Sequence, residues 1–224
     1  MNLIKHSEFF NPIIDLQDTQ LHIIGCGAIG SFVAEALARL GCPELHIYDF
    51  DTVEEANITN QLYTHSDIGK RKIDALSLKL KEINPNITIC PHQKWEPETN
   101  TARGYIFMCV DSIQTRKDIV NTNKYNSAIK AIFDFRMNLK DAQHYAAKWT
   151  SDIDKEKLIK SMDFTDEEAK ENTPVSPCGT TLSISPTVHA IVAAGIANFI
   201  NIAKDDKYAT TIVVNPFSGQ QLYL

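Results

Sequence analysis

The chain has 224 residues, 43% hydrophobic and 22% charged, which is ordinary for a globular protein and enough to form a core without disulfides or metals. Its net charge of -6 and its lack of a long Lys/Arg cluster argue against nucleic acid as a primary partner, because phosphate neutralisation needs concentrated positive charge. No apolar run reaches the roughly 18 residues of a membrane span, and the N-terminus lacks the basic, apolar and small-residue succession of a secretory signal, so we expect no membrane partner.

The first half of the chain alternates predicted strands with predicted helices. Helical spacing predicts helices at 29–41, 69–83 and 113–127, and apolar stretches predict strands at 21–25, 45–49, 87–90, 105–110 and 128–133. Strands and helices in this order imply right-handed crossovers and a mainly parallel sheet. The predicted fold is therefore α/β, with a Rossmann-like, mostly parallel sheet, helices on both faces and a C-terminal extension.

The second half has a different composition. Residues 143–149 fit either a strand or a short amphipathic segment. Residues 150–172 are rich in Asp, Glu and Lys, which favours an exposed helical insertion or a mobile loop. An Ala-rich apolar helix is expected at 187–203, either in the core or at a subunit contact. A terminal hairpin is expected at 211–215 and 222–224.

The first predicted strand runs into the motif G-x-G-x-x-G, and a helix follows. In such a loop the first glycine permits a tight turn, the second lets the backbone approach a phosphate, and the third lets helix and strand pack. The helix N-terminus offers unpaired N–H groups to the anion. We therefore predict that Gly25, Gly27, Ala28 and Gly30 hold a nucleotide; the alternative is an ordinary tight turn.

Acidic and amide side chains follow the second predicted strand. Asp49 lies 19 residues after Gly30, about the distance at which an acidic residue meets ribose hydroxyls. Asp51 suits a site for a triphosphate and its magnesium, because hard cations take oxygen ligands. The next loop carries three amides that can donate to phosphate without adding charge, namely Asn57, Asn60 and Gln61. A solvated strand end and an ordinary polar loop are the simpler alternatives.

Cations and one more carboxylate complete the candidate site. Lys70, Arg71 and Lys72 open a predicted helix, where they oppose its dipole, and a polyphosphate would compensate for them. One lysine is enough for this, and the others are interpreted as surface charges. Asp111 follows the buried strand at 105–110 and is the candidate magnesium ligand; an N-cap for the next helix is a comparable interpretation.

The cysteines stand at positions 26, 42, 90, 109 and 178, and no two form C-x-x-C. This pattern favours a reduced, cytoplasmic setting and argues against a four-cysteine zinc site, so we expect no zinc site. Cys178 lies in a Pro-Cys-Gly segment and is a candidate nucleophile. Buried packing is the usual fate of a lone cysteine and remains the alternative.

The motifs G-x-G-x-x-G, D-F-D, N-x-x-N-Q, G-K-x-K and a buried strand ending C-V-D together resemble the ThiF/MoeB/HesA adenylyltransferases, relatives of the ubiquitin-activating enzymes. The resemblance covers roughly 20–140 and is weaker at 176–200. It implies a single adenylation domain over 1–224, with a nucleotide-binding core at 1–140, an exposed insertion at 141–175 and a C-terminal helix and hairpin at 176–224. It also implies a homodimer.

The resemblance further implies that ATP and Mg²⁺ activate the C-terminal carboxylate of a small ubiquitin-like protein or peptide as an acyl-adenylate, with release of pyrophosphate. Asp49 would hold the ribose, and Asn57 and Gln61 would face the phosphates. Lys72 would contact the phosphates, Asp111 would hold magnesium, and Cys178 would form a thioester if the family's covalent variant applies.

Three departures from the family pattern leave other interpretations open. Asn60 stands where N-x-x-R-Q has an arginine, residues 1–20 contain Lys5 but no arginine, and the paired C-x-x-C motifs are absent. Arg71 and Arg136 are candidates to replace the missing charge. One alternative is a catalytically weakened scaffold that binds nucleotide or a partner. The other is an NAD-dependent oxidoreductase, in which Asp51 and Lys72 would have no role.

Overall fold

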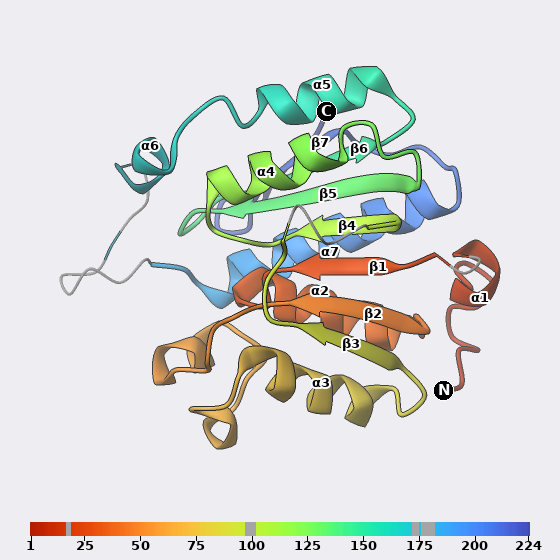
Figure 1. Cartoon of the computed structure of the whole chain (residues 1–224), viewed down its shortest axis with the longest axis vertical. Coiled ribbons are helices and arrows are strands. Elements are labelled where there is room, and N and C mark those ends of the chain that lie inside the picture. Colours follow the sequence, from red (N-terminus) through yellow and green to blue (C-terminus); the bar gives the residue numbers. More distant parts are fainter. Residues whose placement is uncertain (17–18, 97–101, 172–174, 176–181) are drawn as a thin grey trace.

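The fold is built on one eight-stranded sheet, seen in the computed structural model of the chain (Figure 1). The structure describes residues 1–16, 19–96, 102–171, 175 and 182–224. The strands are β1 (Leu21–Ile24), β2 (Glu44–Tyr48), β3 (Thr88–His92), β4 (Gly104–Met108), β5 (Ile129–Met137), β6 (Ala142–Lys148), β7 (Thr211–Asn215) and β8 (Gln220–Tyr223). Their order in the sheet is β3-β2-β1-β4-β5-β6-β7-β8. Strands β1 to β5 pair in parallel, and β6, β7 and β8 are added antiparallel, so the predicted mostly parallel sheet is confirmed.

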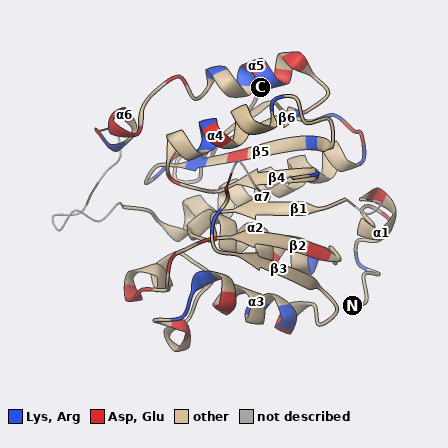
Figure 2. Cartoon of the chain, viewed as in Figure 1, with Lys and Arg blue, Asp and Glu red and all other residues tan. Residues whose placement is uncertain are grey.

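Helices cover both faces of this sheet, as predicted. The helices are α1 (Pro12–Asp15), α2 (Ala28–Arg39), α3 (Lys72–Ile83), α4 (Ile113–Asn123), α5 (Asp152–Lys160), α6 (Asp166–Glu171) and α7 (Ser185–Ala203), with 3-10 turns η1 (Glu55–Thr59) and η2 (His65–Asp67). Helices α2, α3 and α7 share one buried cluster with the sheet. Helices α4 and α5 contribute to a second cluster on the other face. Charged residues of both signs lie along α3 and α5 on the outside, whereas β1 and α7 carry none (Figure 2).

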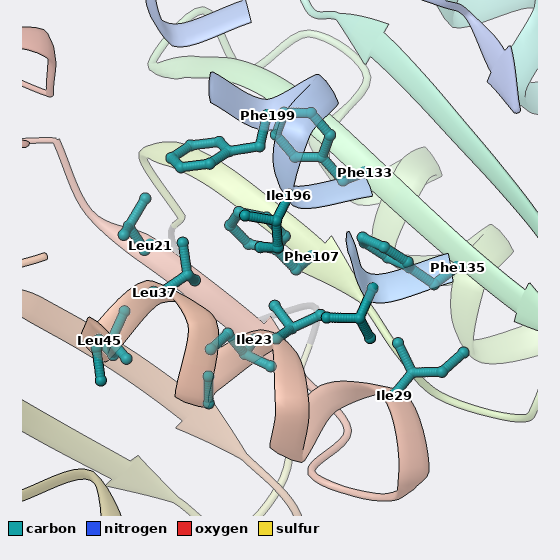
Figure 3. Packing of buried hydrophobic residues seen from close by; sticks show 14 of the residues in the cluster. Leu21, Ile23, Ile29, Leu37, Leu45, Phe107, Phe133, Phe135, Ile196 and Phe199 are labelled. Carbon is teal, nitrogen blue, oxygen red and sulfur yellow. The ribbon is translucent and has the colours of Figure 1, made fainter. Parts of the chain in front are cut away.

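The central strand β4 shows why the apolar runs predicted buried strands. Tyr105 and Phe107 belong to the cluster under α2 and α7, and Ile106 and Met108 belong to the cluster under α4. A strand that is covered on both faces needs apolar residues at every position, so its sequence reads as a continuous run. On the α7 side, the ring of Phe199 packs edge-on against Phe107 at 5.3 Å between centroids (Figure 3).

Helix α7 belongs to the core. By length and composition alone it is apolar enough to cross a membrane, which the sequence analysis did not expect of any segment. In the fold, 61% of its most apolar window is buried. Its buried residues share the cluster that β5, β6, β7 and α2 line. This confirms the interpretation of 187–203 as a core helix.

The expectation of an exposed insertion at 141–175 is wrong for residues 142–148, which form β6. Strand β6 pairs with both β5 and β7 inside the sheet. Helix α5 follows; Leu158 within it and Met162, two residues beyond its end, are each 1% exposed. These two apolar residues, with Asp154, whose carboxylate accepts the backbone N–H of Lys148 at 3.1 Å, attach α5 beside β6, so its charged sequence concealed its contact. Within the range 141–175, helix α6 has no buried residue.

The connections create a switch point at the centre of the sheet. From β1 the chain winds outward through α2, β2, α3 and β3, and then returns to β4 on the other side of β1. In open α/β sheets the crevice beyond the carboxyl ends of the two strands at such a point is the usual ligand site. The carboxyl ends of β1 and β4 define that place here.

Candidate nucleotide site

The glycine loop joins β1 to α2 at the switch point. Gly25 has a φ of +92°, and a Cβ there would lie 2.7 Å from the Cys109 carbonyl oxygen. A Cβ on Gly30 would overlap the Gly25 carbonyl group. Packing within the chain therefore explains both glycines. Gly27 has a negative φ of -77°, and a Cβ there would meet no described atom within 4 Å. Close approach of a ligand is the remaining reason for a glycine at position 27.

Asp49 joins the glycine loop to the end of β2. Its carboxylate accepts hydrogen bonds from the backbone N–H of Cys26 at 2.7 Å and from that of Asp51 at 2.8 Å. Burial raises the pKa of Asp49, and these two N–H groups and the charge of Lys72 oppose that shift. Each carboxylate oxygen can accept more than one hydrogen bond, so Asp49 can still bind a ribose hydroxyl. The structure therefore gives Asp49 a loop-positioning role, and its role in binding ribose stays a prediction.

Lys72 is the buried cation of the three at the start of α3. Its side chain is 8% exposed, and its Nζ lies 2.8 Å from Asp51 Oδ2. The side chains of Lys70 and Arg71 are 46% and 52% exposed, as expected for surface charges. Each of the three pairs with a carboxylate, so the chain itself compensates these cations. A polyphosphate is therefore not needed to explain these cations, and its binding by Lys72 stays a prediction.

The three predicted amides do not act as one group. Asn57 Oδ1 accepts the backbone N–H of Glu54 at 2.9 Å and so caps η1. The side-chain nitrogen of Asn60 donates to Ser183 Oγ, in the segment before α7. Gln61 Oε1 is buried and has no hydrogen-bond partner among the described residues. Of the three, Gln61 has the buried acceptor that most needs a ligand or water.

Asp111 lies two residues beyond Cys109, whose backbone N–H donates to the Ile24 carbonyl oxygen at 2.8 Å. It is exposed. The interpretation of Asp111 as an N-cap is wrong, because Ser112 caps α4 and its Oγ accepts the N–H of Thr115 at 3.1 Å. Asp111 thus stands three residues beyond the carboxyl end of β4 and is not used as a helix cap.

Tyr63 is a site residue that sequence reasoning missed. Its hydroxyl donates to the Cys26 carbonyl oxygen at 2.7 Å and lies 3.4 Å from the Lys72 carbonyl oxygen. The residue is 2% exposed. The Tyr63 hydroxyl therefore links the glycine loop to the start of α3. Its only sequence signal was an aromatic residue two positions after Gln61.

A buried charge cluster beyond β4 was also missed. Asp134 on β5 is fully buried, 3.2 Å from Arg116 Nη1 and 2.6 Å from Arg136 Nη2. Burial lowers the pKa of Arg116, and the Asp134 carboxylate opposes that shift. Arg136 also donates to the Ser161 carbonyl oxygen at 2.6 Å. Because these contacts occupy the Arg136 guanidinium, Arg136 does not replace the family arginine. Two features of the sequence could have indicated this cluster: Arg116 lies on the apolar face of helix 113–123, and Asp134 lies inside an apolar strand.

The cysteines near the loop are packing residues, as interpreted. Cys26 is fully buried, and burial raises its pKa and that of Cys109, so neither thiol is readily ionised. Cys178 lies outside the described residues, and its proposed role stays a prediction.

The structure thus brings some of the predicted site residues together and leaves others apart. Asp49, Asp51 and Lys72 are linked to one another and to the glycine loop on one side. Asp111 follows β4 by three residues, and β4 pairs with β1 on the side opposite β2. Asn60 instead contacts the segment before α7.

Comparisons with known proteins agree with this geometry. A protein-family model described as the ThiF family matches residues 11–210. The chain is 34% identical over 118 residues to tRNA threonylcarbamoyladenosine dehydratase of Haemophilus influenzae, covering 50% of this chain and 45% of that protein. It is also 34% identical over 90 residues to Ubiquitin-like modifier-activating enzyme 5 of Oryza sativa subsp. japonica, covering 40% of this chain and 21% of that protein. The chain spans less than half the length of these curated relatives.

Solved structures share the fold. PaaA superimposes with a TM-score of 0.71 at 17% identity, covering 94% of this chain and 64% of that one. E. coli MccB with ATP superimposes with a TM-score of 0.68 at 19% identity, with the same coverage of 94% and 64%.

Proposed function

Because the chain belongs to the ThiF family, we propose that it is an ATP-dependent adenylyltransferase that activates the C-terminal carboxylate of a small ubiquitin-like protein or peptide. The observation that carries the proposal is the open space at Gly27, in a glycine loop whose other two glycines are explained by packing. The relatives support the substrate class, since one is a ubiquitin-like modifier-activating enzyme. MccB, which shares the fold, has been crystallised with ATP and with N-formylated MccA.

The net charge favours a protein or peptide over RNA as the substrate. One relative is a tRNA threonylcarbamoyladenosine dehydratase, but binding to tRNA phosphates needs concentrated positive charge. This chain has a net charge of -6, and each cation at the start of α3 is paired with a carboxylate.

The proposed reaction forms one bond and breaks one. A carboxylate oxygen of the substrate attacks the α-phosphorus of ATP, the bond to the bridging oxygen of the β-phosphate breaks, and pyrophosphate leaves. The chain supplies position and charge for this step. Asp49 binds the ribose, the Gly27 backbone approaches the phosphates, and Lys72 faces the charge that develops on them.

Asp111 fits a magnesium ion, because it is an exposed carboxylate at the carboxyl end of β4 that is not used as a helix cap. Magnesium bound there would neutralise part of the triphosphate charge. Asp51 is half-exposed and paired with Lys72, so its role is to hold that lysine beside the loop.

Exchange of radiolabelled pyrophosphate into ATP tests the proposal. We expect exchange that depends on a partner ending in a free carboxylate, in a panel of ubiquitin-like proteins and short peptides. Asp111→Ala should abolish exchange. Asp118→Ala, the same change on α4 at a residue that accepts from Gln114 at 2.8 Å, should not. Exchange that survived Asp111→Ala would overturn the magnesium assignment.

Tight ATP binding without exchange on any partner would instead favour a scaffold that has lost catalysis. Asn60, which occupies the position of the family arginine, motivates that alternative. Stabilisation of the protein by NAD but not by ATP–magnesium in a thermal-shift assay would favour the oxidoreductase.

An exposed apolar surface supports the proposal that the chain forms a homodimer. Ile4, Phe9, Ile13 and Ile14, near the N-terminus, are 78%, 61%, 75% and 63% exposed. Several large apolar side chains exposed within one short segment are typical of protein contacts. Light scattering during gel filtration is expected to give twice the chain mass of 25.1 kDa, and Ile13→Asp with Ile14→Asp should give the single-chain mass.

A further inference from the structure

A cluster of metal-binding side chains lies away from the nucleotide site. It occupies the corner of the sheet formed by β1, β2 and β3, on the face opposite α2 and α3. Parallel pairing places His22, His46 and Cys90 in one cross-strand row. Glu44 and His92 lie two residues away from that row on the same face, on β2 and β3 respectively.

Three of these side chains converge closely enough to share an ion. The ligand atoms of Glu44, His46 and Cys90 all lie within 4.8 Å of one another. His46 Nε2 is 2.9 Å from Glu44 Oε1. Carboxylate oxygen, imidazole nitrogen and thiolate sulfur are all ligands that zinc accepts, and the sulfur disfavours magnesium or calcium.

The surroundings fix the orientation of the His46 ring. His46 Nδ1 lies 3.2 Å from His92 Nε2, and the His46 ring stacks on His22 at 4.7 Å between centroids. Without an ion, His46 Nε2–H donates to the Glu44 carboxylate, which can only accept; zinc would replace that proton, and His46 Nδ1–H would then donate to His92 Nε2. A histidine that ligates a metal characteristically makes such a hydrogen bond with its other ring nitrogen. Nε2 faces Glu44, which is the direction that ligation requires.

The cluster is open to solvent on one side. The side chain of His46 is 15% exposed and that of Glu44 is 38% exposed, whereas His22 is 2% exposed. An ion can therefore reach it from solvent, and three protein ligands leave a fourth position for water.

We propose that Glu44, His46 and Cys90 bind one zinc ion, with His92 positioning the His46 ring and water completing a tetrahedron. Such an ion would join the edge strand β3 to β2. Glu44 begins β2 and Asp49 follows its end, five residues later, so the site stands roughly 16 Å along the strand from the nucleotide loop. The sequence analysis expected no zinc site because the cysteines are not paired in C-x-x-C. The ligands here come from two strands 44 residues apart in the sequence, which only the pairing of β2 and β3 brings together.

Metal titration of the whole chain, purified and treated with a chelator, tests the proposal. We expect one equivalent of Zn²⁺ to bind in calorimetry and to raise the melting temperature. Co²⁺ in its place should give the visible bands of a tetrahedral site with a thiolate-to-metal charge-transfer band. Cys90→Ser should remove that band and weaken zinc binding at least tenfold. His92→Phe should weaken binding roughly 10- to 100-fold and keep the band.

Two control variants separate this site from others. Cys109 and His65 lie outside the cluster, so Cys109→Ser and His65→Gln should leave zinc binding unchanged. If Cys90→Ser does not fold, Glu44→Gln and the cobalt spectrum of the wild-type chain carry the test. Absence of saturable binding, a cobalt spectrum without the charge-transfer band, or wild-type affinity in Cys90→Ser or Glu44→Gln would each overturn the proposal and leave a stack of rings without a metal.

Discussion

Lys72 is tied to Asp51 twice: its Nζ lies 2.8 Å from the carboxylate, and its backbone N–H donates to the Asp51 carbonyl oxygen at 2.9 Å. The start of α3 is thereby attached to the turn after β2, the same turn from which Asp49 reaches the glycine loop. A buried ammonium in a fixed position can stabilise charge that develops on a ligand without reorganising first.

Replacing Lys72 by Met should therefore reduce pyrophosphate exchange by about 10²- to 10³-fold, the usual effect of losing one preorganised charge donor. Lys70→Met is the matched control, since Lys70 lies two residues away with a side chain 46% exposed. We expect Lys70→Met to retain at least half of the wild-type rate. Equal losses in the two variants would mean that general positive charge, and not the position of Lys72, is what matters.

Two glycine substitutions should separate folding from binding. Gly30→Ala places a Cβ into the Gly25 carbonyl group and should prevent stable folding. Gly27→Ala meets no described atom, so its free energy of unfolding should stay within about 1 kcal/mol of wild type. Its affinity for ATP should nevertheless fall at least tenfold, because the methyl group occupies the path of a phosphate. Urea denaturation and calorimetric ATP titration measure the two effects, and unchanged ATP affinity in Gly27→Ala would contradict the proposed phosphate position.

Asn60→Arg should restore the charge of the family pattern at the cost of the contact with Ser183. A charge-assisted hydrogen bond to phosphate contributes about 1.5–3 kcal/mol, so we expect the KM for ATP to fall roughly tenfold or more. Asn60→Gln keeps the amide without the charge and should leave KM within about threefold of wild type. A rise in KM for Asn60→Arg would show that the site is adjusted to Asn60 and its contact with Ser183.

His144 should make stability depend on pH. Burial lowers the pKa of its imidazole to about 4, against about 6.5 for an unfolded histidine. Between these values the unfolded chain binds a proton at this position and the folded chain does not. Stability from this residue is therefore complete above pH 6.5 and is lost towards pH 4, by about 1.4 kcal/mol per pH unit. Urea unfolding at several pH values between 4.5 and 6.5 gives the free energy of unfolding. Its slope against pH should be smaller in His144→Gln than in wild type by that amount, and equal slopes would contradict the prediction.

Asp134→Ala should destabilise the fold strongly. Two arginines face this fully buried carboxylate, and removing it leaves their charges in the interior without a partner. The expected loss is about 3–5 kcal/mol in the free energy of unfolding. Asp141→Ala, at an exposed carboxylate that binds the Asn215 amide, serves as the control and should cost less than about 1 kcal/mol. A small effect at Asp134 would mean that water already reaches the pair.

The sheet and the glycine loop could be predicted because they depend on local rules. A strand buried on both faces must be apolar throughout, and the turn at Gly25 needs a positive φ. The pairing of Asn60 with Ser183 could not be predicted, because the two residues are 123 positions apart and meet only through packing. The packing of α5 was misjudged for a related reason: it is attached to β6 by Leu158 and by Met162 just beyond the helix, and most of its other residues are polar.

The position of α7 has a consequence for how the protein is made. This helix packs beside α2 and over β5 to β7, yet it is completed only at Ala203, near the end of the chain. During translation, β1 and α2 therefore leave the ribosome long before α7 is made, and their apolar faces stay exposed to solvent until then. Because α7 packs on the sheet only after most of the chain has been made, we expect slow folding that needs chaperones. A chain cut before α7 is expected to aggregate and not to give a smaller folded protein.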